Sequence, residues 1–191
     1  MKNGLNEFKL NTFQLRRRAG EMKEYELDIT VLERIGVDLV SIPVGGVIEV
    51  DARLESVAEG ILLTAAIFAK ATGECIRCLD PIEFEVDRKI QELYYYEAPL
   101  TDAKNSTGNG ELEEDDELIM EGDLMDLEIP IRDAIILSLP VNPVCNLDCQ
   151  GLCPECGLKW LELEPDHTHK VVDLRWASLE GLKLNDPDFK I

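Results

Sequence analysis

Apolar and polar residues alternate with a period of two through much of the chain between residues 21 and 96. In the clearest run, IEVDARLE at residues 48–55, every second residue is apolar and each residue between is charged. Residues 82–87 repeat this alternation, residues 61–69 fit a strand with few polar residues on its outer face, and the segment CIRCLDP lies between the two. This alternation is typical of strands that bury one face. It predicts an antiparallel meander in which the CIRC segment lies in the turn of a hairpin.

Two earlier segments extend this prediction. Residues 8–15 and residues 25–32 both fit strands. In the first of them, one face would carry Phe8, Leu10, Thr12 and Gln14. Residues 1–96 are therefore predicted to be mainly antiparallel β structure, as a sheet or a partly closed barrel.

The spacing of apolar residues changes after residue 122. Helical spacing gives one apolar face to Leu127, Ile131, Ala134, Ile135 and Leu139. Asp126 precedes this pattern as a candidate N-cap, Pro130 fits near the first turn, and Pro140 would stop the helix. The pattern predicts a helix within residues 123–140.

The rest of the second half is predicted to be largely irregular. Residues 97–122 contain the polar run TDAKNSTGNG and the acidic run ELEEDDE, which predict a flexible acidic loop. Residues 161–191 are predicted to form a tail with one short helix over Asp173–Lys183. That helix would turn Leu174, Ala177 and Leu182 inward, with Trp176 as a packing anchor. With 191 residues, 45% of them hydrophobic, the chain is predicted to be a single α+β domain.

The chain is strongly acidic. Its 19 Lys and Arg residues against 39 Asp and Glu residues give a formal net charge of −20. Such a surface repels nucleic acid, whereas a basic protein partner would fit it. The densest block, Glu111–Glu117, is interpreted either as a solvated loop or as an arm that docks on such a partner. For the basic run Arg16–Arg18, a solvated turn is favoured over a phosphate contact.

All six cysteines lie in close pairs. Cys75 and Cys78 form the CIRC motif, and the segment NPVCNLDCQGLCPECG at residues 142–157 holds the other four. A CxxC turn places two thiolates on one side of a tight loop, as tetrahedral zinc requires. The beginning of the chain shows no signal-peptide pattern, so a cytoplasmic protein with reduced, metal-bound thiols is expected. A closed four-thiolate site would be structural, because it leaves no position for substrate.

Two ligand sets are open for one structural zinc ion. The first joins the two CxxC turns through Cys75, Cys78, Cys153 and Cys156. The alternative is local and uses Cys145, Cys149, Cys153 and Cys156. His167 and His169 lie in the polar segment PDHTHK and are not favoured as ligands, because six thiols already oversupply a four-ligand site.

Nothing in the sequence indicates catalysis. It has no phosphate loop, nucleophile elbow, HExxH motif or dinucleotide fingerprint. A redox dithiol needs a CxxC motif at a helix N-terminus, whereas Gly157 directly after Cys156 favours a tight turn. The longest apolar run, around residues 61–69, is too short to span a membrane. A protein without enzymatic activity is predicted.

Several segments together resemble one protein family. They are CIRCLDPIEFEV, the acidic insert, DLEIPIRDAIILSLPVNPVCNLDCQGLCPECG and DLRWASLEGLK. These are similar to the YceD family of bacteria and plastids, the large ribosomal RNA subunit accumulation proteins. The most specific parts are the CxRCL turn, the LPVxPxC exit from the helix and the DCxGLCPxCG segment. The resemblance covers about residues 46–183.

The resemblance implies a non-enzymatic factor that supports 23S ribosomal RNA accumulation or processing during large-subunit assembly. Because some family members lack several of the cysteines, it also implies that the metal stabilises the fold and is not the functional centre. Together with the charge, it favours action through a basic ribosomal protein or a large-subunit assembly intermediate. Two other classes stay open: a zinc-stabilised acidic adaptor unrelated to ribosomes and, less favoured, a thiol oxidoreductase.

Overall fold

The computed structural model describes residues 7–97, 118–169 and 175. Contacts between residues divide the chain into two compact units, residues 1–149 and residues 150–191. The boundary falls inside residues 141–160, for which the sequence predicts one cysteine-rich metal-binding segment. The single domain expected over residues 1–191 stays a prediction.

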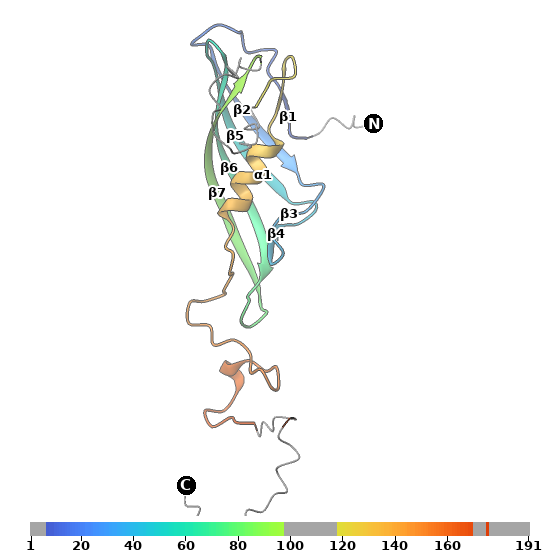
Figure 1. The fold of residues 1–191 in the computed structure, drawn as a ribbon, viewed down its shortest axis with the longest axis vertical. Helices are drawn as coiled ribbons and strands as arrows, with labels where there is room; N and C mark the ends of the chain where they lie inside the picture. The colour runs from blue at the N-terminus through green and yellow to red at the C-terminus, as the bar shows by residue number, and fades with distance from the viewer. Residues whose placement is uncertain (1–6, 98–117, 170–174, 176–191) are drawn as a thin grey trace, which may run out of the picture. The chain divides into compact units, whose positions relative to one another are not determined.

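An antiparallel sheet of six strands forms the frame of the first unit (Figure 1). The strands are β2 (Met22–Thr30), β3 (Ile35–Gly36), β4 (Val40–Ile42), β5 (Val47–Ser56), β6 (Gly60–Glu74) and β7 (Pro81–Tyr95). β5 pairs with β2 on one side and with β6 on the other. β6 continues beyond β5 and pairs with β4, which pairs with β3. The other edge of β6 pairs with β7 over the full length of both strands.

The inner face of this sheet carries the hydrophobic core. Alternate residues of β5 and β6, such as Ile48 and Ile67, are fully buried there. Helix α1 (Glu128–Ser138) packs against β7 and β3 and contributes Ile131 and Ile135 to the same cluster. A separate two-stranded ribbon of β1 (Lys9–Asn11) and β8 (Leu124–Asp126) adds Met125. Burial of each such side chain contributes about 1.5–3 kcal/mol.

The beginning of α1 is fixed by hydrogen bonds around Asp126. Its carboxylate Oδ1 accepts from the backbone N–H of Glu128 at 2.9 Å, one of the donors that the first turn of a helix leaves without a partner. The Tyr94 hydroxyl of β7 donates to the backbone carbonyl of Asp126 at 2.7 Å. Pro130 lies in the first turn, where its missing N–H costs little, and the helix ends two residues before Pro140.

The structure confirms the main elements that the sequence predicts. The runs at residues 48–55, 61–69 and 82–87 lie in β5, β6 and β7, and the CIRC segment lies in the turn between β6 and β7. The strand expected over residues 25–32 overlaps β2, and the expected helix is α1. Period-two alternation identified β2, β5 and β7 because their outer positions are mostly polar, whereas in β6 the alternation is one of burial and not of polarity.

Other expectations need correction. The sheet is open and does not close into a barrel, since its strand order ends at separate edge strands. Residues 8–15 form only the short strand β1, and Gln14 is exposed. β3 and β4 were not predicted, because strands of two and three residues are too short to show a period. Within the described part of the chain, α1 and a 3-10 turn at Trp160–Glu162 are the helical elements, so the expectation of several short helices is met only in part.

Some predictions fall on residues that the structure does not describe. The acidic block Glu111–Glu117 lies outside the described residues, as does the expected helix over Asp173–Lys183 apart from residue 175. The end of the predicted loop is ordered, because the N–H of Tyr95 donates to the carbonyl oxygen of Leu118 at 2.8 Å and Met120 is buried. Among the described helices, none has the length and apolar character that crossing a membrane requires.

Candidate metal centres

The first CxxC motif forms a tight turn between β6 and β7, which we call the first turn (Cys75–Leu79). The N–H of Cys75 donates to the carbonyl oxygen of Asp80 at 2.8 Å, and the N–H of Leu79 donates to that of Cys75 at 2.9 Å. Leu79 has a φ of 61°, in the left-handed region that favours glycine. The N–H of Arg77 points at the Cys75 sulfur at 3.4 Å. The side chains of Cys75 and Cys78 are both buried.

The second CxxC motif repeats this geometry in the second turn (Cys153–Gly157). The N–H of Cys153 donates to the carbonyl oxygen of Leu158 at 2.8 Å, and the N–H of Gly157 donates to that of Cys153 at 2.8 Å. Gly157 has a φ of 72° and takes the place of Leu79. Both turns therefore close with the same two hydrogen bonds at the same spacing. The tight turn expected from Gly157 is confirmed.

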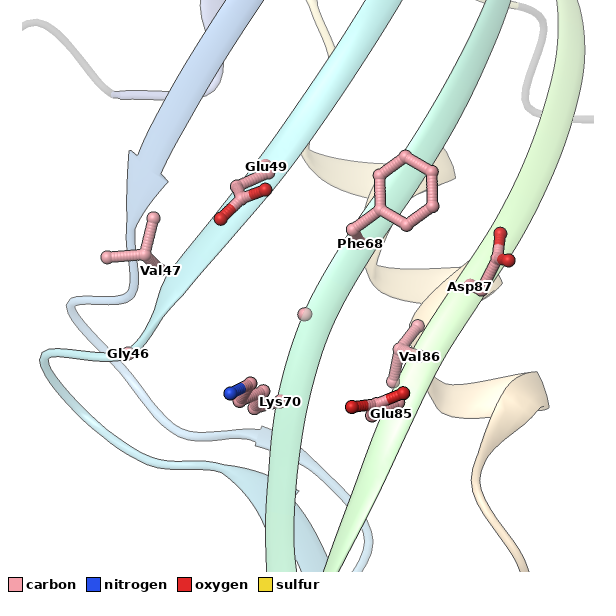
Figure 2. Close-up of a pocket in the computed structure, with 9 residues that line it drawn as sticks. Gly46, Val47, Glu49, Phe68, Lys70, Glu85, Val86 and Asp87 are labelled. Atoms are coloured by element: carbon pink, nitrogen blue, oxygen red, sulfur yellow. The ribbon is translucent and has the colours of Figure 1, made fainter.

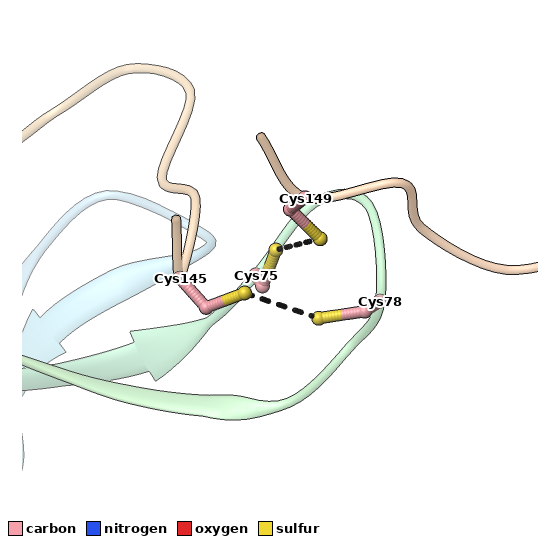
Figure 3. Close-up of side chains that lie close together, drawn as sticks. All are labelled: Cys75, Cys78, Cys145 and Cys149. Atoms are coloured by element: carbon pink, nitrogen blue, oxygen red, sulfur yellow. Dashed lines mark hydrogen bonds between the residues drawn. The ribbon is translucent and has the colours of Figure 1, made fainter. Parts of the chain in front are cut away.

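Four sulfur atoms meet at the first turn (Figure 3). The Sγ atoms of Cys75 and Cys149 lie 3.9 Å apart, and those of Cys78 and Cys145 lie 3.5 Å apart. All four sulfurs lie within 4.8 Å of one another. A tetrahedral zinc ion with Zn–S bonds of about 2.3 Å separates its sulfurs by roughly 3.8 Å. This four-cysteine cluster (Cys75, Cys78, Cys145 and Cys149) therefore fits a zinc ion with little rearrangement.

The chain that follows α1 is held against the first turn by the two middle residues of the CIRC motif. The N–H of Ile76 donates to the carbonyl oxygen of Pro143 at 2.9 Å. The Nη1 atom of Arg77 donates to the carbonyl oxygens of Leu147 and Cys149, at 3.2 Å and 2.8 Å. These contacts bring the second cysteine pair to the first. The motif thus supplies two ligands and also positions the other two.

Without a metal, the thiols of this cluster cannot all ionise together. Burial raises the pKa of the Cys75 thiol, but the backbone N–H groups of Cys78, Cys145 and Arg77 lower that pKa to about 6. At Cys78 a backbone N–H favours the thiolate, yet burial and the neighbouring sulfurs raise its pKa to about 12. A divalent cation removes this conflict, because it compensates several thiolates at once. The Cys75 sulfur is fully buried, so its lowered pKa does not expose a nucleophile.

A different cluster lies in the second unit. The ligand atoms of Cys153, Cys156, His167 and His169, which we call the mixed cluster, lie within 4.8 Å of one another. The Sγ atom of Cys156 lies 3.5 Å from Nε2 of His167. The backbone N–H of Cys156 lowers the pKa of the Cys153 thiol, and burial offsets this only in part. A tight turn therefore favours a thiolate here without the helix N-terminus that the sequence argument required.

The structure groups the cysteines differently from both expected ligand sets. Cys75 and Cys78 meet Cys145 and Cys149, whereas Cys153 and Cys156 meet the two histidines. The expected sets each combined a pair from one group with a pair from the other. Sequence reasoning set His167 and His169 aside because it counted ligands for a single site. Their spacing, His-x-His shortly after a CxxC turn, was the available signal. Metal binding itself is not shown, and it belongs to the proposals below.

The outer face of the sheet, opposite α1, is strongly acidic and exposed. Its outward positions carry ten carboxylates and three cations, the latter being Arg53, Lys70 and Lys89. The carboxylates of this acidic face are Glu24, Glu26, Asp28, Glu49, Asp51, Glu55, Glu74, Glu83, Glu85 and Asp87. A shallow groove of about 650 Å³ crosses this face near β5, β6 and β7 (Figure 2).

Like charges lie directly opposite each other on the acidic face. Asp28 pairs with Glu49, and Glu26 pairs with Asp51, across β2 and β5. Phe68 of β6 lies between Glu49 and Asp87 in the groove, with 36% of its surface exposed (Figure 2). Opposed like charges lower the stability of a sheet. The arrangement therefore does not contribute to the stability of the free protein.

The basic run at residues 16–18 is partly used within the first unit. The Nη2 atom of Arg17 donates to the backbone carbonyl of Gly122 at 2.7 Å and to the carboxylate of Asp123 at 2.9 Å. Its guanidinium group also lies over the ring of Tyr96, 4.8 Å from the centroid. Arg16 and Arg18 are exposed. The central arginine therefore serves the fold, which favours the solvated-turn interpretation over a phosphate site.

Comparison with protein families gives one match. The profile of the family described as large ribosomal RNA subunit accumulation protein YceD matches residues 63–183. This range includes the four-cysteine cluster and the mixed cluster. No solved structure matches the chain.

The similar curated proteins are named as uncharacterized proteins. A protein of Mycobacterium tuberculosis is 42% identical over 166 residues, which cover 87% of this chain and 76% of the relative. A protein of Mycobacterium leprae is 37% identical over 172 residues, covering 90% and 76%. The protein YlbN of Bacillus subtilis is 22% identical over 183 residues, covering 94% of this chain and 99% of the relative. None of these names describes an enzyme.

Proposed function

The chain belongs to the YceD family of large ribosomal RNA subunit accumulation proteins, and from that premise we propose that it is a non-enzymatic factor for large-subunit assembly. The family name implies a role in the accumulation of the large-subunit ribosomal RNA. The finer proposal is that the protein supports 23S ribosomal RNA by binding a basic protein of the assembling large subunit. The family match itself confirms the resemblance drawn from the CIRC, LPVNPVC and CPECG segments.

The acidic face is the observation that supports a basic protein partner. Ten carboxylates against three cations give this surface a negative potential that attracts cationic segments and repels RNA. Phe68 and Val47 supply apolar contact area inside the groove. An aromatic side chain among carboxylates suits a peptide that carries Lys or Arg together with apolar residues. The opposed pairs Asp28–Glu49 and Glu26–Asp51 would be relieved by such a partner.

The four-cysteine cluster supports a structural zinc ion in this proposal. It would join the β6–β7 hairpin to the chain after α1, with the sulfurs of Cys75, Cys78, Cys145 and Cys149 as ligands. Four thiolates close the coordination sphere, so the ion would hold the fold together and leave no open position for substrate. This role agrees with the non-enzymatic part of the proposal.

A neutralised acidic face tests the proposed partner. The triple variant Asp28→Asn, Glu49→Gln and Asp51→Asn removes carboxylates from both opposed pairs. Cells that carry it as their only copy should accumulate less 23S ribosomal RNA relative to the small-subunit RNA. The variant should also lose salt-sensitive, nuclease-resistant cosedimentation with large-subunit precursors.

A matched control removes the same charge elsewhere. Glu33→Gln, Asp38→Asn and Asp133→Asn are exposed positions away from the acidic face and should leave RNA levels unchanged. The acidic-face variant should be slightly more stable than the wild type, because it loses like-charge pairs that cost about 0.2–1 kcal/mol each. A functional loss then cannot be ascribed to unfolding. Normal 23S RNA in cells without the protein would refute the ribosomal role, and nuclease-sensitive binding of the isolated protein to RNA would refute the protein partner.

A further inference from the structure

We propose that Cys153, Cys156, His167 and His169 form a second zinc site, independent of the four-cysteine cluster, so that each chain binds two zinc ions. This inference goes beyond the proposed function, which involves only the four-cysteine cluster. It concerns the second unit alone and does not depend on any role in ribosome assembly.

The ligand atoms of the mixed cluster have the spacing of a tetrahedral site. With Zn–S bonds of about 2.3 Å and Zn–N bonds of about 2.0–2.1 Å, neighbouring sulfur and nitrogen ligands lie roughly 3.6 Å apart. The Cys156 sulfur and Nε2 of His167 lie 3.5 Å apart. All four ligand atoms lie within 4.8 Å of one another. Two thiolates and two imidazoles are a common ligand set for structural zinc.

The backbone around the mixed cluster is built to present these ligands. The second turn is closed by the same hydrogen bonds as the first turn. Leu152 and Lys159 pair as an antiparallel bridge on either side of it. The Trp160 ring lies edge-on to the His167 ring, with centroids 5.7 Å apart. The two imidazole rings lie edge to face, with centroids 4.4 Å apart and an angle of 85° between their planes.

The described run of the second unit, residues 150–169, shows little apolar burial. Among residues 150–169, only Gly151 and Cys153 are buried. The apolar side chains Leu158 and Leu161 are 52% and 81% exposed. A segment this short with no hydrophobic core needs a covalent or metal crosslink to hold a defined structure. A zinc ion in the mixed cluster supplies such a crosslink, because metal binding and folding are coupled in small metal-binding units.

The inventory of ligands in the whole chain agrees with two sites. The sequence contains six cysteines and two histidines. Two tetrahedral sites need eight ligands. The two clusters use every cysteine and every histidine of the chain, once each. The oversupply of thiols that argued against histidine ligands disappears once two ions are counted.

The test measures zinc per chain on the full-length protein purified under reducing conditions. Elemental analysis of the wild type should give two zinc ions per chain. The double variant His167→Ala and His169→Ala should lose one of them, and the control Thr168→Ala, at the exposed position between them, should keep both. The conservative variant His167→Cys, made with His169 intact, should bind two zinc ions, because a thiolate also binds zinc in this geometry.

Cobalt replacement assigns each loss to a site. Cobalt in a four-thiolate site has stronger thiolate charge-transfer absorption than cobalt bound by two thiolates and two imidazoles. The histidine double variant should therefore lose the mixed-ligand component and keep the four-thiolate one. Variant Cys145→Ser with Cys149→Ser should show the opposite loss. Two zinc ions in the histidine double variant, or one zinc ion in the wild type that the histidine changes leave in place, would overturn the proposal. One zinc ion that the histidine changes remove would support the mixed site and refute the four-cysteine one.

Discussion

The first and second turns have the same local geometry and reach four ligands by opposite routes. The first turn lies between two long strands with both of its cysteines buried, and its other two candidate ligands come from a segment 67 and 74 residues later in the chain. The second turn lies among residues 150–169, which are mostly exposed, and its other candidate ligands, His167 and His169, begin 11 residues after Cys156. The CxxC motif therefore fixes a turn and two ligands. The other two candidate ligands come from a distant segment where the motif joins two strands of the sheet, and from the following segment where it does not.

Because of this difference, the two proposed zinc ions are expected to contribute differently to the stability of their units. In the first unit, the sheet and α1 form a core without help from metal, so zinc would add a crosslink to a structure that already folds. In the second unit, two buried residues among residues 150–169 cannot form a core, so zinc would be the main source of order. Zinc binding is thus expected to add stability to the first unit and to be required for the folding of the second.

Removal of metal should separate the two regions most strongly. Structural zinc contributes about 10–16 kcal/mol in small zinc-binding peptides, far more than a core of this size could replace. A strong chelator should abolish the amide protection of residues 150–169 and leave β5, β6 and β7 protected. Hydrogen exchange on the metal-loaded and metal-free protein makes this comparison. Equal loss of protection in both units would show that the sheet also depends on zinc.

A core substitution should affect the first unit alone. Ile135 of α1 is fully buried, and Ile135→Ala should lower the free energy of unfolding by about 2–5 kcal/mol through lost burial and a cavity. Leu137→Ala is the matched control, because Leu137 is 84% exposed and should change stability by less than about 0.5 kcal/mol. Denaturant titration followed by β-sheet circular dichroism measures both. The cobalt spectrum of the mixed cluster should be the same in both variants, and a change in it would couple the units.

The fifth residue of each turn offers a pair of opposite substitutions. Gly157→Ala should destabilise the second turn by about 1 kcal/mol, because a left-handed φ of 72° is strained for alanine even though no atom lies within 4 Å of the added Cβ. Leu79→Gly should stabilise the first turn by up to about 1 kcal/mol, since the φ of 61° is strained for leucine. Zinc-competition titrations measure the change in zinc affinity of the mixed cluster in Gly157→Ala and of the four-cysteine cluster in Leu79→Gly. Effects of the same sign would mean that the two turns are not equivalent.

Alkaline pH should weaken the first unit specifically, because all four tyrosines of the chain precede residue 97. Burial, and then the charges of Asp126 and Glu92, raise the pKa of Tyr94 above its usual value near 10. The folded state therefore holds this proton more tightly, and the stability that it contributes is complete below about pH 10 and declines as the pH rises above it. Burial also raises the pKa of Tyr25, so Tyr94→Phe should reduce this decline and leave the smaller part that Tyr25 contributes. The variant should also cost about 1 kcal/mol at neutral pH through the lost hydrogen bond to Asp126. Urea unfolding of both proteins at several pH values provides the test, and an unchanged alkaline slope in the variant would assign the decline to another group.

The sequence by itself determined the local features of this protein. Period-two alternation located β2, β5, β6 and β7, and helical spacing located α1 between Asp126 and Pro140. The glycine after Cys156 predicted a tight turn, and the CIRC, LPVNPVC and CPECG segments identified the family. These inferences succeeded because each depends on a few neighbouring residues, whose steric and burial preferences act within one strand, turn or helix.

Only the tertiary structure decided which cysteines meet. Cys145 and Cys149 reach the first turn because β6 and β7 end beside the chain that leaves α1, and because Ile76 and Arg77 hold that chain by its carbonyl groups. No spacing in the sequence records that distance. The open sheet and the short strands β3 and β4 were likewise set by pairing between distant segments. Local preference fixes the shape of each turn, whereas the sheet register and the path of the helix fix the position of that turn relative to its partners.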